Sequence, residues 1–403
     1  MNEVYKAKQI TEHVWWVGAI DWNIRDFHGY STSRGTTYNA FLVMGEKIAL
    51  IDTVKAPFYN EMMSRITSVI DPEKIDYIIS NHAEMDHTGA LIPTIDRVKP
   101  EKVLASKQGV KAINAQLHLD YEVSEVKSAE TLDLGGLTLE FLETRMLHWP
   151  DSMFTYLKEE KLLFSQDAFG MHLASGQCFA DQVDRSVLEF EATKYYANIL
   201  MLFGPFVEKV LAKVGEMGWE LDIIAPDHGP IWREKDDIGW ILGKYAEWAS
   251  CKSTKKAVIV YATMWGSTHK MAQAIGEGLS ESGVDVKMLS LNTNHRSDVA
   301  TEVLDAAVLL VGSPTMNNNM HPKVADVLTY LKGLKPKNLI GQSFGSYGWG
   351  GESIKQVADV LEAMQVEAVG EPLKIRYVPT AEDLKTFREF GKLLAEKIES
   401  VIS

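Results

Sequence analysis

The sequence predicts an α/β protein of two domains. The first is a layered sandwich with two sheets inside and helices outside, and the second is a doubly wound parallel sheet. Three observations lead to this prediction. Short strands occur in two series before residue 250, regular strand–helix alternation follows residue 256, and a polar segment separates the two patterns. The 403 residues are enough for two or three domains, each with its own core.

The first predicted domain spans residues 1–250. Its first series of β-rich runs is separated by Gly, Asn and Asp turn signals and by helical stretches. These runs are residues 14–20, 37–43, 47–53 and 76–80. The second series comprises residues 102–106, 132–144, 154–157, 161–165 and 221–227. Two series of strands with helices between them indicate sheets packed face to face, with the helices outside.

The second predicted domain spans residues 256–403 and follows the polar segment 249–256. Its strands are apolar almost throughout, as expected when both faces of a parallel sheet are covered. They lie at residues 257–262, 284–291, 306–312, 338–345 and 366–378, and a helical stretch follows each one. Five such units in about 150 residues indicate a doubly wound fold.

The composition indicates a soluble globular protein and excludes several kinds of partner and metal site. Hydrophobic residues make up 46% and charged residues 24%, ordinary values for a soluble globular protein. The net charge of -14 argues against a nucleic-acid partner. No apolar run is long enough to span a membrane, and the N-terminus shows no secretion signal, so we expect a cytoplasmic protein. The two cysteines are too few for a disulfide framework, a zinc ribbon or an iron–sulfur cluster. A bound metal must therefore be held by His, Asp and Glu.

Seven such residues stand at the ends of predicted strands. His82, Glu84, Asp86 and His87 follow the apolar run 76–80, and a solvated polar loop does not account for four potential ligands within six residues. Because alternate residues of an extended chain share a face, we expect His82, Glu84 and Asp86 to converge and His87 to point toward a second metal. Later strands are followed by three more candidates, His148, Asp167 and His228. Strand ends are where α/β proteins place their ligands.

Three loops of the second domain also follow strands. The first opens a helix and offers hydroxyls and backbone amides to an anion, but it has no Lys and a single Gly, so it is a poor match to a triphosphate loop. It comprises Thr263, Met264, Trp265, Gly266, Ser267 and Thr268. The second provides Ser313, Pro314, Thr315, Asn317 and Asn318. The third provides Ser346, Tyr347, Gly348, Trp349, Gly350 and Gly351, where an aromatic ring can stack on a flat cofactor.

The pattern H-x-E-x-D-H, with later His, Asp and His at strand ends, resembles the metallo-β-lactamase fold in its flavodiiron form. The three loops of the second domain look like the FMN-binding loops of flavodoxins. The zinc hydrolases of the fold typically carry a second histidine where this chain has Glu84. A carboxylate is a harder donor than imidazole, which shifts the site from zinc toward iron or manganese. The resemblance covers essentially the whole chain and is closest to the A-type members, the rubredoxin:oxygen oxidoreductases.

The resemblance implies a role for each candidate. His82, Glu84 and His148 would hold one iron, Asp86, His87 and His228 would hold the other, and Asp167 would bridge them. Coordination by His87 stays open, because it requires a local bend beside Asp86 and a water could replace it. The residues that match positions lining the diiron pocket of the family are His28, His172 and Tyr196.

The resemblance implies an oxidoreductase that reduces O2 to water, NO to N2O, or both. A diferrous pair and a reduced FMN together can supply the four electrons that O2 requires. Because the chain has no C-x-x-C pair, the donor must be separate, and the resemblance implies rubredoxin or a similar carrier. It also implies a head-to-tail homodimer or a dimer of dimers. Two alternatives stay open: a dinuclear zinc hydrolase of the same fold with an appended flavodoxin domain, and a flavin-based electron carrier. The preference for O2 or NO cannot be predicted.

Overall fold

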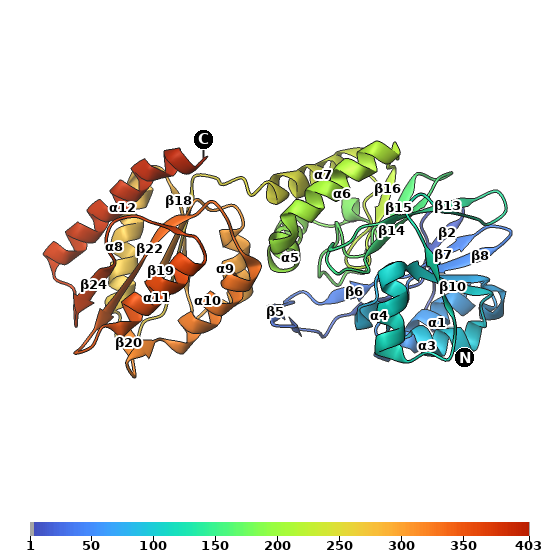
Figure 1. Ribbon diagram of the computed structural model, residues 1–403, viewed down its shortest axis with the longest axis horizontal. Coiled ribbons are helices and arrows are strands. Elements are labelled where there is room, and N and C mark those ends of the chain that lie inside the picture. Colours follow the sequence, from blue (N-terminus) through green and yellow to red (C-terminus); the bar gives the residue numbers. More distant parts are fainter. Residues whose placement is uncertain (1–3, 403) are drawn as a thin grey trace. The chain divides into compact units, whose positions relative to one another are not determined.

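The structure, a computed structural model, describes residues 4–402. The chain divides into two compact units (Figure 1). Unit 1 comprises the described residues up to Tyr195 together with Pro205–Ala246, and unit 2 comprises Tyr196–Gly204 and the residues from Glu247 onward. The segment Tyr196–Gly204 therefore groups with unit 2, although the sequence predicts it in the first domain.

Unit 1 is built on a seven-stranded sheet and a five-stranded sheet. The first sheet has the order β1 (Lys8–Gln9), β2 (Val14–Trp16), β7 (Phe41–Met44), β8 (Ile48–Ile51), β9 (Tyr77–Ser80), β10 (Lys102–Ser106) and β11 (Val123–Val126). The second has the order β12 (Thr131–Asp133), β13 (Thr138–Glu143), β14 (Met153–Leu157), β15 (Leu162–Phe164) and β16 (Ile223–Ala225). From β8 to β11 the strands pair in parallel, as do β15 and β16.

Alternation along the strands explains why the sheets stack. Ile51 and Ile79 point into a core shared with Phe141 and Phe164 of the second sheet, whereas the neighbouring Leu50 joins a different core. That second core lies against the helices α1 (Tyr59–Thr67), α3 (Leu91–Val98) and α4 (Lys107–Leu117). Ser106 begins α4 by accepting a hydrogen bond from the amide of Gly109 at 3.0 Å.

Helices also pack against the second sheet. They are α5 (Arg185–Tyr195), α6 (Gly204–Met217) and α7 (Lys235–Ala249). The ring of Phe154 in β14 lies 6.3 Å from that of Phe169, which lies 4.5 Å from that of Tyr245 in α7. Because Met153 points into the core between the sheets, Phe154 points to the opposite face, which α7 covers. These contacts confirm the predicted sandwich.

Short elements complete unit 1. Two small antiparallel ladders pair β3 (Ala19–Asp21) with β6 (Thr36–Tyr38), and β4 (Asp26–Phe27) with β5 (Tyr30–Ser31). The four-residue helix α2 (Met85–Thr88) follows β9 after a short loop. Helix α2 carries two of the candidate ligands, and the ladders lie near a third, since the rings of Phe27 and Tyr38 lie 6.4 and 5.9 Å from that of His228.

Unit 2 is a parallel sheet with the order β18 (Asp285–Ser290), β17 (Lys256–Tyr261), β19 (Val308–Gly312) and β22 (Ile340–Tyr347), beyond which β23 (Glu367–Ala368) and β24 (Leu373–Arg376) both pair with β22. Its helices are α8 (Ser267–Glu281), α9 (Arg296–Val303), α10 (Pro322–Leu334), α11 (Glu352–Ala363) and α12 (Ala381–Ile402). A short hairpin pairs β20 (Thr315–Met316) with β21 (Asn319–Met320). The strand order 2-1-3-4-5 is that of the flavodoxin-like fold, which confirms the prediction.

Two hydrophobic cores cover the two faces of this sheet. One joins the strands to α8 and α12, and the other joins them to α9, α10 and α11 (Figure 1). Helices α8 and α12 pack very closely, since a Cβ added to Gly278 would lie 1.9 Å from the carbonyl oxygen of Arg388. The second core also contains Ala197 and Met201, and Tyr330 donates a hydrogen bond to Asn198 at 2.8 Å. These contacts explain why the segment Tyr196–Gly204 belongs to unit 2.

Candidate metal and flavin sites

Four candidate ligands follow the end of β9. His82 and Glu84 lie in the loop, where Glu84 has extended backbone angles, and Asp86 and His87 lie in α2. The expectation that residues 82–86 continue in an extended conformation is therefore wrong, because the chain turns into a helix at Met85. The turn separates Asp86 from His82 and Glu84 and gives Asp86 and His87 a common direction.

The other three candidates come from loops of the second sheet. His148 follows β13, Asp167 follows β15 and His228 follows β16. Hydrogen bonds from a neighbouring strand-end residue hold the loop of His228 in place. The side chain of Asn39 donates hydrogen bonds to the carbonyls of Pro226 and Gly229, at 2.6 and 2.9 Å.

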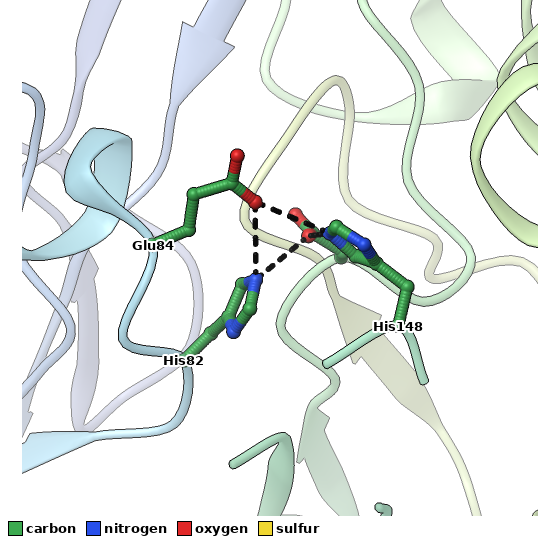
Figure 2. Close-up of side chains that lie close together, drawn as sticks. His82, Glu84 and His148 are labelled. Carbon is green, nitrogen blue, oxygen red and sulfur yellow. Dashed lines mark ion pairs between the residues drawn. The ribbon is translucent and has the colours of Figure 1, made fainter. Parts of the chain in front are cut away.

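The structure gathers all seven candidates into two groups of potential ligands, within each of which the donor atoms lie within 4.8 Å of one another. One group contains His82, Glu84, His148 and Asp167, and the other contains Asp86, His87 and His228. Figure 2 shows His82, Glu84 and His148 pointing toward one another. Oε2 of Glu84 lies 3.4 Å from Nε2 of His82 and 3.3 Å from Nε2 of His148.

Asp167 lies between the two groups. Its Oδ2 is 2.9 Å from Nε2 of His148 and 3.5 Å from Nε2 of His82. Its Oδ1 is 3.3 Å from Nε2 of His87 and 3.4 Å from Nε2 of His228. One oxygen therefore faces each group, which is the geometry of a carboxylate that bridges two metals.

The electrostatics of the cluster fit metal ligands. Burial raises the pKa of Asp167, but the surrounding His87, His148 and His82 outweigh burial and hold it well below its ordinary value. Burial lowers the pKa of His87, but Asp86 and Asp167 outweigh it and raise the pKa to about 10. Opposite charges thus hold the cluster together, and histidines that bind a metal must release their protons.

Several donor atoms of the cluster are buried and have no hydrogen-bond partner among the described residues. They are Nε2 of His82, Nε2 of His87, Oδ1 of Asp167 and both carboxylate oxygens of Asp86. Buried polar atoms without partners are costly, and a pair of cations would satisfy all of these at once. The donor set of histidines and carboxylates suits iron, so the residues present fit a diiron centre.

The structure places the three predicted pocket residues differently from one another. His28 has a side chain that is 76% exposed, with its Nε2 3.5 Å from Oε1 of Glu84. His172 is buried, and its Nδ1 lies 2.9 Å from Oγ1 of Thr36. Burial, together with the nearby His228, lowers the pKa of His172 well below its ordinary value, so its ring is neutral. A cavity of about 550 Å³, lined in part by Phe27, His28, Glu84 and Asp86, adjoins the ligands.

The prediction of Tyr196 requires correction. It is the ring of Tyr195 that lies 5.1 Å from the ring of His172 and 6.2 Å from that of His228. The ring of Tyr196 lies 5.0 Å from that of Trp248 in unit 2. The physical reason is the end of α5 at Tyr195, where a π-helical turn begins at Tyr196 and directs the next side chain elsewhere.

In unit 2, the three predicted loops meet at a cavity of about 510 Å³. Its lining has no charged side chain among the described residues. It is formed by Met264, Trp265, Ser267, Pro314, Thr315, Asn317, Asn318, Ser346, Tyr347, Gly348, Trp349, Gly350, Tyr377 and Val378. Trp265 and Trp349 are 93% and 86% exposed, which is unusual for a large aromatic residue unless a ligand or partner covers it.

The remaining five predicted residues of these loops support the cavity rather than line it. Gly266 precedes α8 at φ +86°, and its amide donates to Oγ1 of Thr263 at 3.1 Å. Oγ1 of Thr268 lies 3.2 Å from Oγ of Ser346. The hydroxyl of the buried Ser313 donates to the carbonyl of Pro314, and Gly351 precedes α11 at φ +131°. A side chain at either glycine would be strained.

Comparison with known proteins identifies the family. The ODP family beta lactamase model matches residues 36–229, and the flavodoxin model matches residues 259–391. The nitric oxide reductase of Moorella thermoacetica is 45% identical, with 96% of this chain and 98% of the relative covered. The rubredoxin-oxygen oxidoreductase of Megalodesulfovibrio gigas is 44% identical, with 99% and 100% covered. The chain belongs to the flavodiiron protein family.

Solved structures of flavodiiron proteins show the same fold over nearly the full length. The rubredoxin oxygen:oxidoreductase from Desulfovibrio gigas has a TM-score of 0.96 at 43% identity and covers 99% of this chain and 100% of its own. The flavodiiron protein from Giardia intestinalis has a TM-score of 0.95 at 32% identity, with 98% of each chain covered. As a flavodiiron protein, the chain has FMN and a non-haem diiron centre as its cofactors, and the two sites fit them.

The structure also places residues at the two candidate sites that the sequence did not predict there. Tyr377 and Val378 line the cavity of unit 2 directly after β24, so the rule that ligands lie at strand ends would have found them. Asp151 lies behind His82, with its Oδ2 2.9 Å from Nδ1 of His82, and only the tertiary fold brings the two together.

In the part of the chain that the structure describes, no helix has the length and apolar character of a membrane span.

Proposed function

We propose that this flavodiiron protein reduces dioxygen to water, nitric oxide to nitrous oxide, or both, at a diiron centre that receives electrons through FMN. The observation that carries the proposal is the position of Asp167, with one carboxylate oxygen facing each of two histidine-rich groups. The curated relatives support it, since they are named as a nitric oxide reductase and a rubredoxin-oxygen oxidoreductase.

In this proposal, His82, Glu84 and His148 hold one iron and Asp86, His87 and His228 hold the other, with Asp167 bridging the two. The two groups of donor atoms support this division. His87 is included because its Nε2 faces the bridging carboxylate at 3.3 Å, next to Asp86 in α2. When bound, the irons and the flavin supply the electrons for the reduction.

The side chains around the ligands would handle protons and exclude water. His28 is exposed on one side and reaches Glu84 on the other, so its Nε2 can bring a proton from solvent to the edge of the pocket. Thr36 fixes the ring of His172 through Nδ1. The rings of Tyr195 and Phe27 pack on His172 at 5.1 and 4.9 Å and leave a largely apolar wall beside a polar cluster. Such a wall suits a small apolar gas.

For FMN, we propose binding in the cavity of unit 2. The N-terminus of α8, which begins at Ser267 after Gly266, would receive the phosphate. Trp265, Tyr347 and Trp349 line the cavity and can flank the flat ring system. The absence of charged residues from the described lining fits a phosphate bound through neutral donors.

The electron donor and the assembly are further parts of the proposal. We infer a separate rubredoxin-type donor, which the names of the relatives support. We also propose a head-to-tail homodimer, or a dimer of dimers, in which the FMN of one subunit serves the diiron centre of the other. We also propose a cytoplasmic location, where the two cysteines would stay reduced.

Anaerobic turnover tests the proposed function. Protein assayed for iron, zinc and FMN is mixed with a reduced rubredoxin, and O2 and NO are offered separately. Rapid consumption of either gas by protein with two irons and one FMN per chain supports the proposal, and the ratio of rates identifies the preferred gas. Zinc in place of iron would favour a hydrolase. Failure of fully iron- and FMN-loaded protein to consume either gas, while the donor reduces its flavin, would refute the proposal.

A further inference from the structure

Histidine ligands are oriented through the ring nitrogen that does not face the metal. In this cluster His228 has its Nδ1 2.6 Å from the carbonyl oxygen of Thr37. His82 has its Nδ1 2.9 Å from Oδ2 of Asp151, whose same oxygen also accepts a hydrogen bond from the amide of Ala83 at 2.6 Å. Each of these two rings therefore has a well-bonded partner behind it.

His87 has a different neighbour. Its Nδ1 lies 3.3 Å from Oδ2 of Asp227, and both residues are buried, at 1% and 0% exposure. Among the residues that the structure describes, neither Nδ1 of His87 nor either carboxylate oxygen of Asp227 has a hydrogen-bond partner. The two groups are thus close and buried, with no hydrogen bond to another described side chain or backbone group, and a small rotation of the ring would join them.

The backbone of Asp227 holds its carboxylate in place. Its amide donates to the carbonyl of Gln166 at 2.8 Å, and its own carbonyl accepts from the amide of Asn39 at 2.7 Å. Gln166 precedes the bridging candidate Asp167, and its Oε1 accepts a hydrogen bond from the amide of Asp167 at 2.6 Å. Asp227 is therefore anchored to the loop that carries Asp167.

The chemistry of imidazole gives this arrangement a function. When Nε2 of a histidine binds a metal, the ring proton resides on Nδ1 and needs an acceptor. A carboxylate in that position fixes the ring orientation and increases the basicity of Nε2. For His87 the acceptor at hand is Oδ2 of Asp227.

We propose that Asp227 is a positioning residue that accepts a hydrogen bond from Nδ1–H of His87 and keeps Nε2 directed at the second iron. The inference rests on the proposed function, because it takes the second group of donors as an iron site. It goes beyond that function by explaining why His87 is a ligand. It also assigns one carboxylate to each half of the centre, Asp151 behind His82 and Asp227 behind His87.

The test compares Fe(II) binding by three variants under anaerobic conditions. Metal-free, FMN-loaded protein is titrated with Fe(II) against a competing chelator, and the two irons are distinguished by Mössbauer spectroscopy. Asp227→Asn, which keeps the shape of the side chain, is expected to weaken one iron by about 10- to 100-fold and to leave the other unchanged. Asp151→Asn, the matched control, is expected to weaken the other iron instead. His87→Ala should weaken the same iron as Asp227→Asn.

A double variant separates positioning from a purely structural role. If Asp227 acts through His87, Asp227→Asn adds no further loss of affinity in a His87→Ala background. The proposal would be overturned if Asp227→Asn lowered the iron affinity equally in the parent and in the His87→Ala background. It would also be overturned if Asp227→Asn alone bound both irons with affinities within twofold of the parent. Failure of the double variant to fold while His87→Ala alone folds would also overturn it. Because the readout is metal affinity, a protein that shows the expected pattern and yet consumes no gas would refute the proposed function and leave this inference standing.

Discussion

Replacing Asp167 with alanine is expected to empty the diiron centre while FMN stays bound. Asp167 is 2% exposed, and each of its carboxylate oxygens faces a different group of candidate ligands. Hydrogen bonds to charged groups contribute about 1.5–3 kcal/mol each, and on that scale the loss of one contact to each of two metals costs about 3–6 kcal/mol in total. At about 1.4 kcal/mol per decade, the affinity of each iron falls by about 10- to 100-fold, and the product of the two affinities falls by about 10²- to 10⁴-fold. Removing one of the three carboxylates proposed as ligands would also leave the positive charge of two metals less well balanced.

The assay measures iron and FMN per chain after purification and then Fe(II) affinity by chelator competition. Asp120→Ala is a suitable control, since it removes an exposed aspartate from the same unit. This control should retain two irons and one FMN. If Asp167→Ala keeps two irons with affinities within twofold of the parent and consumes O2 or NO at the parent rate, the bridging assignment is refuted.

Three further predictions concern the proposed FMN cavity, the surroundings of His172 and the packing of unit 2. Trp349→Ala removes an exposed ring from the proposed FMN cavity and should weaken FMN binding by about 5- to 100-fold, because stacking on an aromatic ring contributes about 1–3 kcal/mol. The iron content should not change. Fluorescence titration with FMN measures the affinity, and unaltered binding would contradict the placement of FMN in this cavity. Tyr195→Leu should slow gas consumption more than Tyr196→Leu, because it removes the ring that packs on His172, and equal effects on the rate would remove the distinction between the two tyrosines. Gly278→Ala should destabilise unit 2 by about 1–3 kcal/mol, because its Cβ would lie 1.9 Å from a carbonyl oxygen of α12. Gly333→Ala, in α10 with open space around it, should leave stability unchanged or raise it by about 0.4–1 kcal/mol; thermal unfolding checks the pair, and a loss of stability for both would contradict the packing argument.

The fold could be predicted from the sequence because its strands are nearly continuous apolar runs that end in polar residues. The same pattern directed attention to His148, Asp167 and His228, since each follows a strand of the second sheet. In unit 2, regular alternation of strand and helix determines the topology almost alone. Strand-end reasoning succeeds where a short loop leaves little freedom to the residues after the strand.

Local geometry was harder to predict. Helix α2 has four residues, too few for a periodic signal, so the sequence predicted an extended chain through Asp86. Tyr195 and Tyr196 are adjacent, and which one faces His172 depends on the π-helical turn that begins between them. Asp151 and Asp227 are placed behind His82 and His87 by tertiary contacts, which no local pattern encodes.

Anomalous diffraction at the iron edge, from crystals of the iron- and FMN-loaded protein, would test the central claim most directly. The account predicts two iron peaks per chain, one bound by His82, Glu84 and His148 and the other by Asp86, His87 and His228, with Asp167 bound to both. A single peak, two peaks that respond at the zinc edge, or an Asp167 side chain that contacts neither metal would contradict the account.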